Sequence, residues 1–95
     1  PTHMESMLFL GNTYGMMGQA DKELEWYEKA KENDPTHRNV IVRLAHFYRW
    51  HKKVEQAKAY ATTALGFEWD EKYGVSKDHF YDEVNDILSW VNKQK

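Results

Sequence analysis

The chain repeats itself at an interval of 34 residues. The tripeptide Pro1-Thr2-His3 returns as Pro35-Thr36-His37. At this offset most apolar or small positions coincide: Met7 falls on Ile41, Leu10 on Leu44, Gly11 on Ala45, Tyr14 on Tyr48, Tyr27 on Ala61 and Ala30 on Ala64, whereas Leu24 falls on Lys58. A period of this length indicates supersecondary units that stack side by side and bury a shared core. No other feature constrains the fold as strongly.

Each copy contains two stretches with apolar residues at helical spacing, separated by a break. The spacing predicts helices over about 3–17, 20–33, 37–51 and 54–65. Gly18 forms the break in the first copy, and His51-Lys52-Lys53 forms the break in the second copy. Gly66 is the expected C-terminal cap of the fourth helix. The small residues Gly11 and Ala45 in mid-helix predict a close approach by the second helix of each pair.

A fifth helix is predicted after an aromatic connection over 66–75. Ser76 is a suitable N-cap, and Asp78 lies in the first turn. One face carries an apolar stripe, formed by Phe80, Val84, Ile87, Leu88 and Val91. The opposite face carries polar residues that we expect to face solvent: Asp82, Glu83, Asp86 and Lys93. One apolar and one polar side is the pattern of a helix that covers the end of a stack.

The string Leu10-Gly11-Asn12-Thr13-Tyr14, followed by Glu28-Lys29-Ala30 and Asp34-Pro35, resembles the tetratricopeptide repeat family. The resemblance implies an all-α fold, an antiparallel helix-pair α-solenoid with two repeats and a C-terminal capping helix. The chain is then a single domain over 1–95, with repeat one at 4–37, repeat two at 38–71 and the capping helix at 76–93. Glu23 departs from the family pattern, which has an alanine there, and Trp69 stands where a second proline is expected.

The N-terminal tripeptide corresponds to the end of a repeat whose body is absent. We therefore expect the chain to be a segment of a longer array. An artificial chain made by copying such a segment fits the same observation.

Composition excludes several classes of function. The formal net charge is −2 and the pI about 6.2, which does not fit a general nucleic-acid binder. The chain has no cysteine, so disulfides and thiolate chemistry are excluded and the cellular compartment stays undecided. Its longest apolar run, Met7-Leu8-Phe9-Leu10, is far shorter than the roughly 20 residues of a membrane span.

No set of residues predicts catalysis, a cofactor or a metal. His46 and His51 are five residues apart, so on one helix they point about 140° apart and cannot bind one ion together. No phosphate-binding glycine loop or nucleophile-and-base pattern occurs. The carboxylates Glu23, Glu25, Glu28 and Glu32 are expected on the solvated face of the second helix, with Glu25 and Lys29 as a supporting pair. We therefore predict that the protein is not an enzyme.

Charge is unevenly distributed along the chain. Residues 36–65 carry 6 basic and 1 acidic side chains, whereas 1–35 carry 3 and 7, and 66–95 carry 4 and 7. In the family that the chain resembles, the first helix of each pair lines a concave groove that receives a peptide. By that match the groove residues include Glu5, Leu8, Met16, Asn39 and Val42, and the main contacts are assigned to Asn12, Arg43, His46, Arg49 and Trp50. The alternative is that the basic charges only neutralise the acidic segments beside them.

The resemblance implies a protein–protein interaction module that binds a peptide or helix of another protein. The family's clamp for chaperone tails does not fit, because Leu8, Arg43 and Tyr73 replace its lysine, asparagine and lysine. The alternative function is a self-associating scaffold. A homo-oligomer would form through an apolar strip on the first helix, Met4, Met7, Leu8 and Phe9, that a preceding repeat would cover.

Overall fold

The computed structural model describes residues 2–66 and 77–94, and all the secondary structure in these ranges is helical. Five helices follow one another: α1 (Thr2–Met16), α2 (Ala20–Asn33), α3 (Arg38–Trp50), α4 (Val54–Leu65) and α5 (Lys77–Lys93). These bounds agree with the helices predicted from the apolar spacing to within two residues. The predicted all-α fold class is therefore confirmed.

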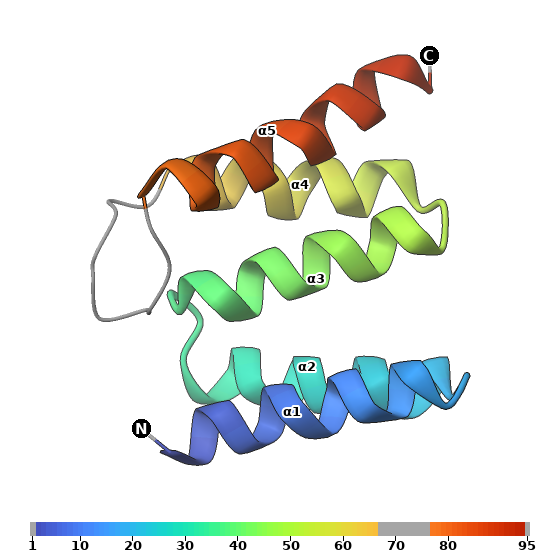
Figure 1. Ribbon diagram of the computed structural model, residues 1–95, viewed down its shortest axis with the longest axis vertical. Helices are drawn as coiled ribbons and strands as arrows, with labels where there is room; N and C mark the ends of the chain where they lie inside the picture. The colour runs from blue at the N-terminus through green and yellow to red at the C-terminus, as the bar shows by residue number, and fades with distance from the viewer. Residues whose placement is uncertain (1, 67–76, 95) are drawn as a thin grey trace.

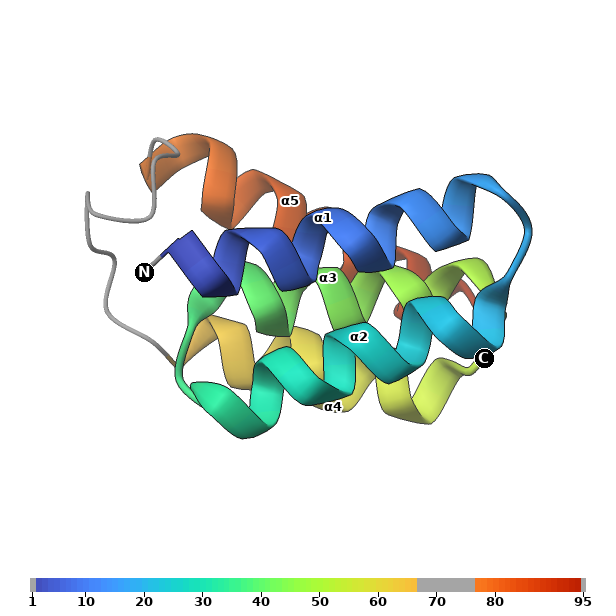
Figure 2. The ribbon, with the colours of Figure 1, turned by 90° about the horizontal axis from the view of Figure 1, so that it is seen from below.

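Neighbouring helices pack against one another in chain order. α1 packs on α2, α2 on α3, and α3 on α4, while α5 lies against both α4 and α3. In both views α1, α3 and α5 run in one direction, and α2 and α4 run in the opposite one (Figures 1 and 2). The result is a compact bundle with a Cα radius of gyration of 12.7 Å.

The turns after α1 and after α3 are built from the same hydrogen bonds. The amide of Gln19 donates to the carbonyl of Tyr14, five residues back, and the amide of Lys53 donates to the carbonyl of Tyr48. Gly18 and Lys52, which precede these donors, both adopt a positive φ, of 76° and 60°. A left-handed residue followed by an amide that donates to the carbonyl five residues before it forms a Schellman motif. This motif supplies hydrogen-bond donors to carbonyl groups at the end of the helix.

Small residues set the distance between α1 and α2. A Cβ at Gly11 would lie only 2.5 Å from Cε1 of Tyr27, whose ring is almost fully buried. The predicted close approach of the second helix at Gly11 is confirmed. Even an alanine could not occupy this position unless the Tyr27 ring moved.

Two groups of buried side chains form the core. The first joins α1, α2 and α3, and contains Met4, Tyr27, Ala30, Val40, Leu44 and Phe47. The second joins α3, α4 and α5, and contains Ile41, Val42, Ala45, Ala57, Ala61, Ala64, Phe80, Val84, Ile87 and Val91. The stacked rings of Tyr48 and Tyr60, 5.7 Å apart, pack against both groups. Because α3 contributes to both, it is the central helix of the bundle.

The predicted apolar stripe of α5 is confirmed, since Phe80, Val84, Ile87 and Val91 are buried. Gly66 does cap α4, but with φ −78° and ψ −12° it keeps the right-handed conformation instead of the left-handed one typical of a capping glycine. Ser76, Trp69 and the connection to α5 lie outside the described residues.

The apolar strip predicted on α1 is largely covered. Met4 is only 5% exposed, because it packs into the core group that α1 shares with α2 and α3. Met7 and Leu8 are half-buried against the same group. Phe9 alone among these four stays exposed, at 69%. The prediction that Met4 faces solvent is therefore wrong.

Candidate functional site

A groove runs between α1, α3 and α5, and consists of two recesses. The first, here called the Trp50 recess, has a volume of about 530 Å³. All five residues predicted as groove contacts line it: Asn12, Arg43, His46, Arg49 and Trp50. The other lining residues come from α2, from the end of α3 and from α5: Glu23, Tyr27, Phe47, His51, Lys52 and Trp90.

The second recess, here called the Phe80 recess, has a volume of about 450 Å³ and lies nearer the start of α3. It is lined by Glu5, Leu8, Phe9, Asn12, Asn39, Val42, Arg43, His79, Phe80 and Glu83. The wider set predicted from α1 and α3 therefore lines one recess or the other, except Met16, which is 81% exposed and lines neither. Asn12 and Arg43 line both recesses, so they mark the point where the two meet.

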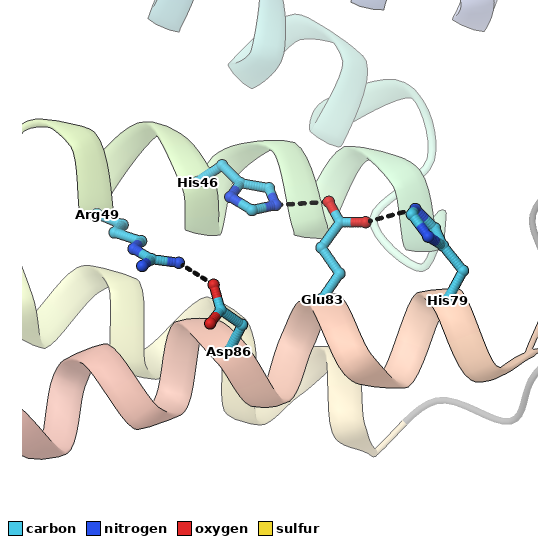
Figure 3. Close-up of polar contacts among 5 residues, drawn as sticks. All are labelled: His46, Arg49, His79, Glu83 and Asp86. Atoms are coloured by element: carbon cyan, nitrogen blue, oxygen red, sulfur yellow. Dashed lines mark hydrogen bonds and ion pairs between the residues drawn. The ribbon is translucent and has the colours of Figure 1, made fainter.

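Acidic side chains of α5 contact the basic face of α3 (Figure 3). His46 Nε2 shares a hydrogen bond of 2.5 Å with Glu83 Oε1, and Arg49 Nη1 donates a hydrogen bond of 2.6 Å to Asp86 Oδ2. His79, one turn before Glu83, lies 3.4 Å from its other carboxylate oxygen. The polar face of α5 was expected to face solvent. Asp86 does so, with 68% of its side chain exposed although it contacts Arg49, whereas Glu83 is half-buried and the prediction is wrong there.

These contacts favour the ionised carboxylates. The hydrogen bond from His46, with the charges of His46, His79 and Arg43, lowers the pKa of Glu83 below its usual value despite partial burial. The hydrogen bond and charge of Arg49 lower the pKa of Asp86 in the same way. Two of the five predicted contact residues are thus already paired inside the protein. The idea that the basic segment neutralises its acidic neighbour therefore holds for Arg49, while His46 is hydrogen-bonded to Glu83.

The Trp50 recess is lined by two tryptophans, of which only Trp50 was predicted. Trp50, at the end of α3, is 82% exposed. Trp90, which the sequence did not predict, lines the same recess, and its ring centroid lies 5.9 Å from the guanidinium carbon of Arg49. The ring of Phe47 packs edge-on against Tyr27 and at 4.4 Å from His51. The recess therefore offers a cation–π pair and an uncovered indole.

A half-buried carboxylate, that of Glu23, lines the Trp50 recess. Glu23 was expected on the solvated face of α2, but its side chain turns inward, where a Cβ at Gly15 would lie 2.5 Å from its Oε2. Burial raises the pKa of Glu23, although a hydrogen bond with Tyr27 and the charge of His51 oppose the shift. Burial and the Glu23 charge raise the pKa of Tyr27 to about 12. Glu23 thus has Tyr27 as a partner.

The chain matches no protein-family model, no curated protein and no solved structure. Its function must therefore be inferred from its own residues.

The described residues show no metal site and no membrane span. In 2–66 and 77–94, no three or more histidine, aspartate or glutamate side chains are placed to hold a metal ion. Within the same ranges, no helix is both long and apolar enough to cross a membrane.

Proposed function

We propose that this chain is a tetratricopeptide-like module that binds a peptide or helical segment of another protein along the groove. In this proposal α1–α2 and α3–α4 are two successive repeats of a helix-pair solenoid, and α5 is the capping helix. The two Schellman turns support it, because Gly18 and Lys52, with their matching hydrogen bonds, are 34 residues apart. The common direction of α1, α3 and α5, the helices that line the groove, supports it too (Figure 2).

One observation carries the binding function. The five contact residues that the family resemblance implies, Asn12, Arg43, His46, Arg49 and Trp50, line a single recess. That recess holds an indole that is 82% exposed, and tryptophan is enriched among the residues that contribute most to binding at protein interfaces. Recognition of an extended or helical segment in a groove is a common mode of peptide binding.

The double variant Arg43→Ala with Trp50→Ala tests this function. Peptides are first selected on the wild-type protein from a displayed random library, and their dissociation constants are then measured by calorimetry. We expect at least a tenfold loss of affinity in the double variant, because a cation and a large aromatic surface are removed together. The far-ultraviolet circular dichroism should not change, since both side chains are exposed.

The matched control is Lys58→Ala with Leu65→Ala. It removes one exposed cation and one exposed apolar side chain from α4, and neither residue lines the groove. The control should bind selected peptides as the wild type does. The proposed function fails if the library yields no peptide, or if the groove variant binds selected peptides as tightly as the control does.

A further inference from the structure

The basic side chains of the groove differ in whether a carboxylate of the protein already contacts them. Among the residues that the structure describes, His46 and Arg49 are paired with carboxylates of α5. Arg43 is exposed and forms no hydrogen bond or ion pair with described residues, acting on Tyr27 and Glu83 only at longer range. An exposed guanidinium with five donors and no carboxylate partner is well suited to bind one from outside.

The position of Arg43 limits where a carboxylate of a ligand can lie. It lines both recesses, so a chain that occupies the whole groove must pass over it. The Phe80 recess is lined by the carboxylates of Glu5 and of Glu83, which is paired with His46, and the Trp50 recess is lined by Glu23. These carboxylates would repel a second anion nearby. Charge complementarity therefore favours one internal acidic residue in the ligand, placed over the junction.

The recesses on either side of Arg43 differ in the side chains that they can accept. The Phe80 recess has an apolar wall formed by Leu8, Val42 and Phe80. The Trp50 recess is lined by the exposed indole of Trp50 and by Trp90. An aliphatic side chain fits the first and an aromatic ring fits the second, because aromatic pairs stack or meet edge to face.

Resting on the proposed function, we propose that the ligand is an extended peptide with an internal acidic residue on Arg43, an aliphatic residue in the Phe80 recess and an aromatic residue in the Trp50 recess. The helix α3 gives the spacing. Trp50 lies seven residues, or about 10 Å, beyond Arg43, which an extended chain covers in about three residues. Asn39, in the Phe80 recess, lies four residues before Arg43, or about 6 Å, which corresponds to about two residues of an extended chain.

Defined peptides test this ligand. The first probe is acetylated and amidated, with leucine, glutamate and phenylalanine separated by one and two serines. The second has the same residues in the opposite order, because the spacing on α3 does not fix the direction of the peptide backbone. In the control peptides glutamine or lysine replaces the glutamate, and a further control has the glutamine together with a free C-terminal carboxylate.

We expect one of the two orders to bind the wild-type protein, and the glutamine version to bind about tenfold more weakly, as for loss of a charge-assisted hydrogen bond. The Arg43→Glu variant should lose binding of the glutamate peptide and prefer the lysine peptide. Lys52→Glu reverses another cation in the Trp50 recess, at its far end. It should leave the preference for glutamate unchanged.

Several outcomes would overturn this inference. One is equal binding of the glutamate and glutamine peptides, another is a preference that follows Lys52 instead of Arg43, and a third is tighter binding of the peptide with the free C-terminus. Failure of both orders to bind would also overturn it. The library selection decides the proposed function separately, because it assumes nothing about ligand sequence. Selected peptides that bind Arg43→Glu normally would refute the acidic ligand and leave groove binding intact.

Discussion

Lys52 has the backbone conformation that Gly18 has in the equivalent turn. Its φ of 60° is costly for a residue with a Cβ, because that carbon approaches the neighbouring carbonyl. Lys52→Gly should therefore raise the free energy of unfolding by about 1 kcal/mol, with part of the gain offset by the greater freedom of glycine in the unfolded chain. Urea unfolding followed by circular dichroism measures the change.

Gly18→Ala is the reverse experiment in the first turn. No atom lies within 4 Å of the Cβ that alanine would add, so its cost comes from the backbone alone. It should lower the free energy of unfolding by about 1 kcal/mol. Equal effects of opposite sign would show that the two turns impose the same constraint. A loss of stability in Lys52→Gly would contradict this account.

Single residues also show where sequence reasoning stopped. The resemblance put a small residue at position 23, and the sequence has a glutamate there. The room for it comes from the facing helix, where Gly15 has no side chain. Gly15, a second glycine in α1 one turn after Gly11, indicates in the sequence that α1 could accommodate a large side chain from α2 at this level. Without the distance between α1 and α2, the sequence could not show that Glu23 turns inward to Tyr27.

At the scale of elements, α5 is held to α3 by a contact that depends on pH. Because the folded protein lowers the pKa of Glu83, this group stabilises the fold above the usual pKa of glutamate, and the contribution is lost as the pH falls below it. Glu83→Gln should lower the free energy of unfolding by about 1 kcal/mol at pH 6. The difference from wild type should shrink as the pH falls below the usual pKa of glutamate, because the wild-type carboxylate then gains its proton. Urea unfolding across this pH range measures it.

Asp82→Asn is the matched control, because it makes the same change of charge on an exposed residue of the same helix. Its effect should be small and nearly independent of pH. The account of Glu83 would fail if the two variants had the same pH dependence. His46 and His79 contact Glu83, and Arg43 acts on it only at longer range, so all three charges contribute to its lowered pKa.

The periodicity of α5 predicted its buried face but not its partners. A repeat of 3.6 residues shows which side chains point inward, and Phe80, Val84 and Ile87 do so. Glu83 and Asp86 border that stripe, and which helix they reach depends on how α5 lies across α3 and α4. The same helical repeat within α3 predicted that Arg43, His46 and Trp50 lie on one face of that helix. Trp90 could not be found this way, because it enters the recess from another helix.

At the scale of the whole molecule, the covered strip on α1 bears on self-association. Met4 is buried, and Phe9 is the one residue of the predicted strip that is exposed. This surface is small for a stable dimer, which needs a large contiguous apolar patch. Light scattering should therefore give a mass near 11.3 kDa over a wide range of protein concentration. A mass that doubles with concentration, and falls back in Phe9→Ser, would instead establish a dimer through α1.

The central place of α3 has a consequence for how the molecule melts. One flank of this helix belongs to the core group of α1 and α2, and the other belongs to the group of α4 and α5. If either group came apart, α3 would expose half of its apolar surface to water and lose much of the packing that keeps it helical. We therefore expect neither core group to stay folded without the other. On heating, the helices should unfold together in one two-state transition.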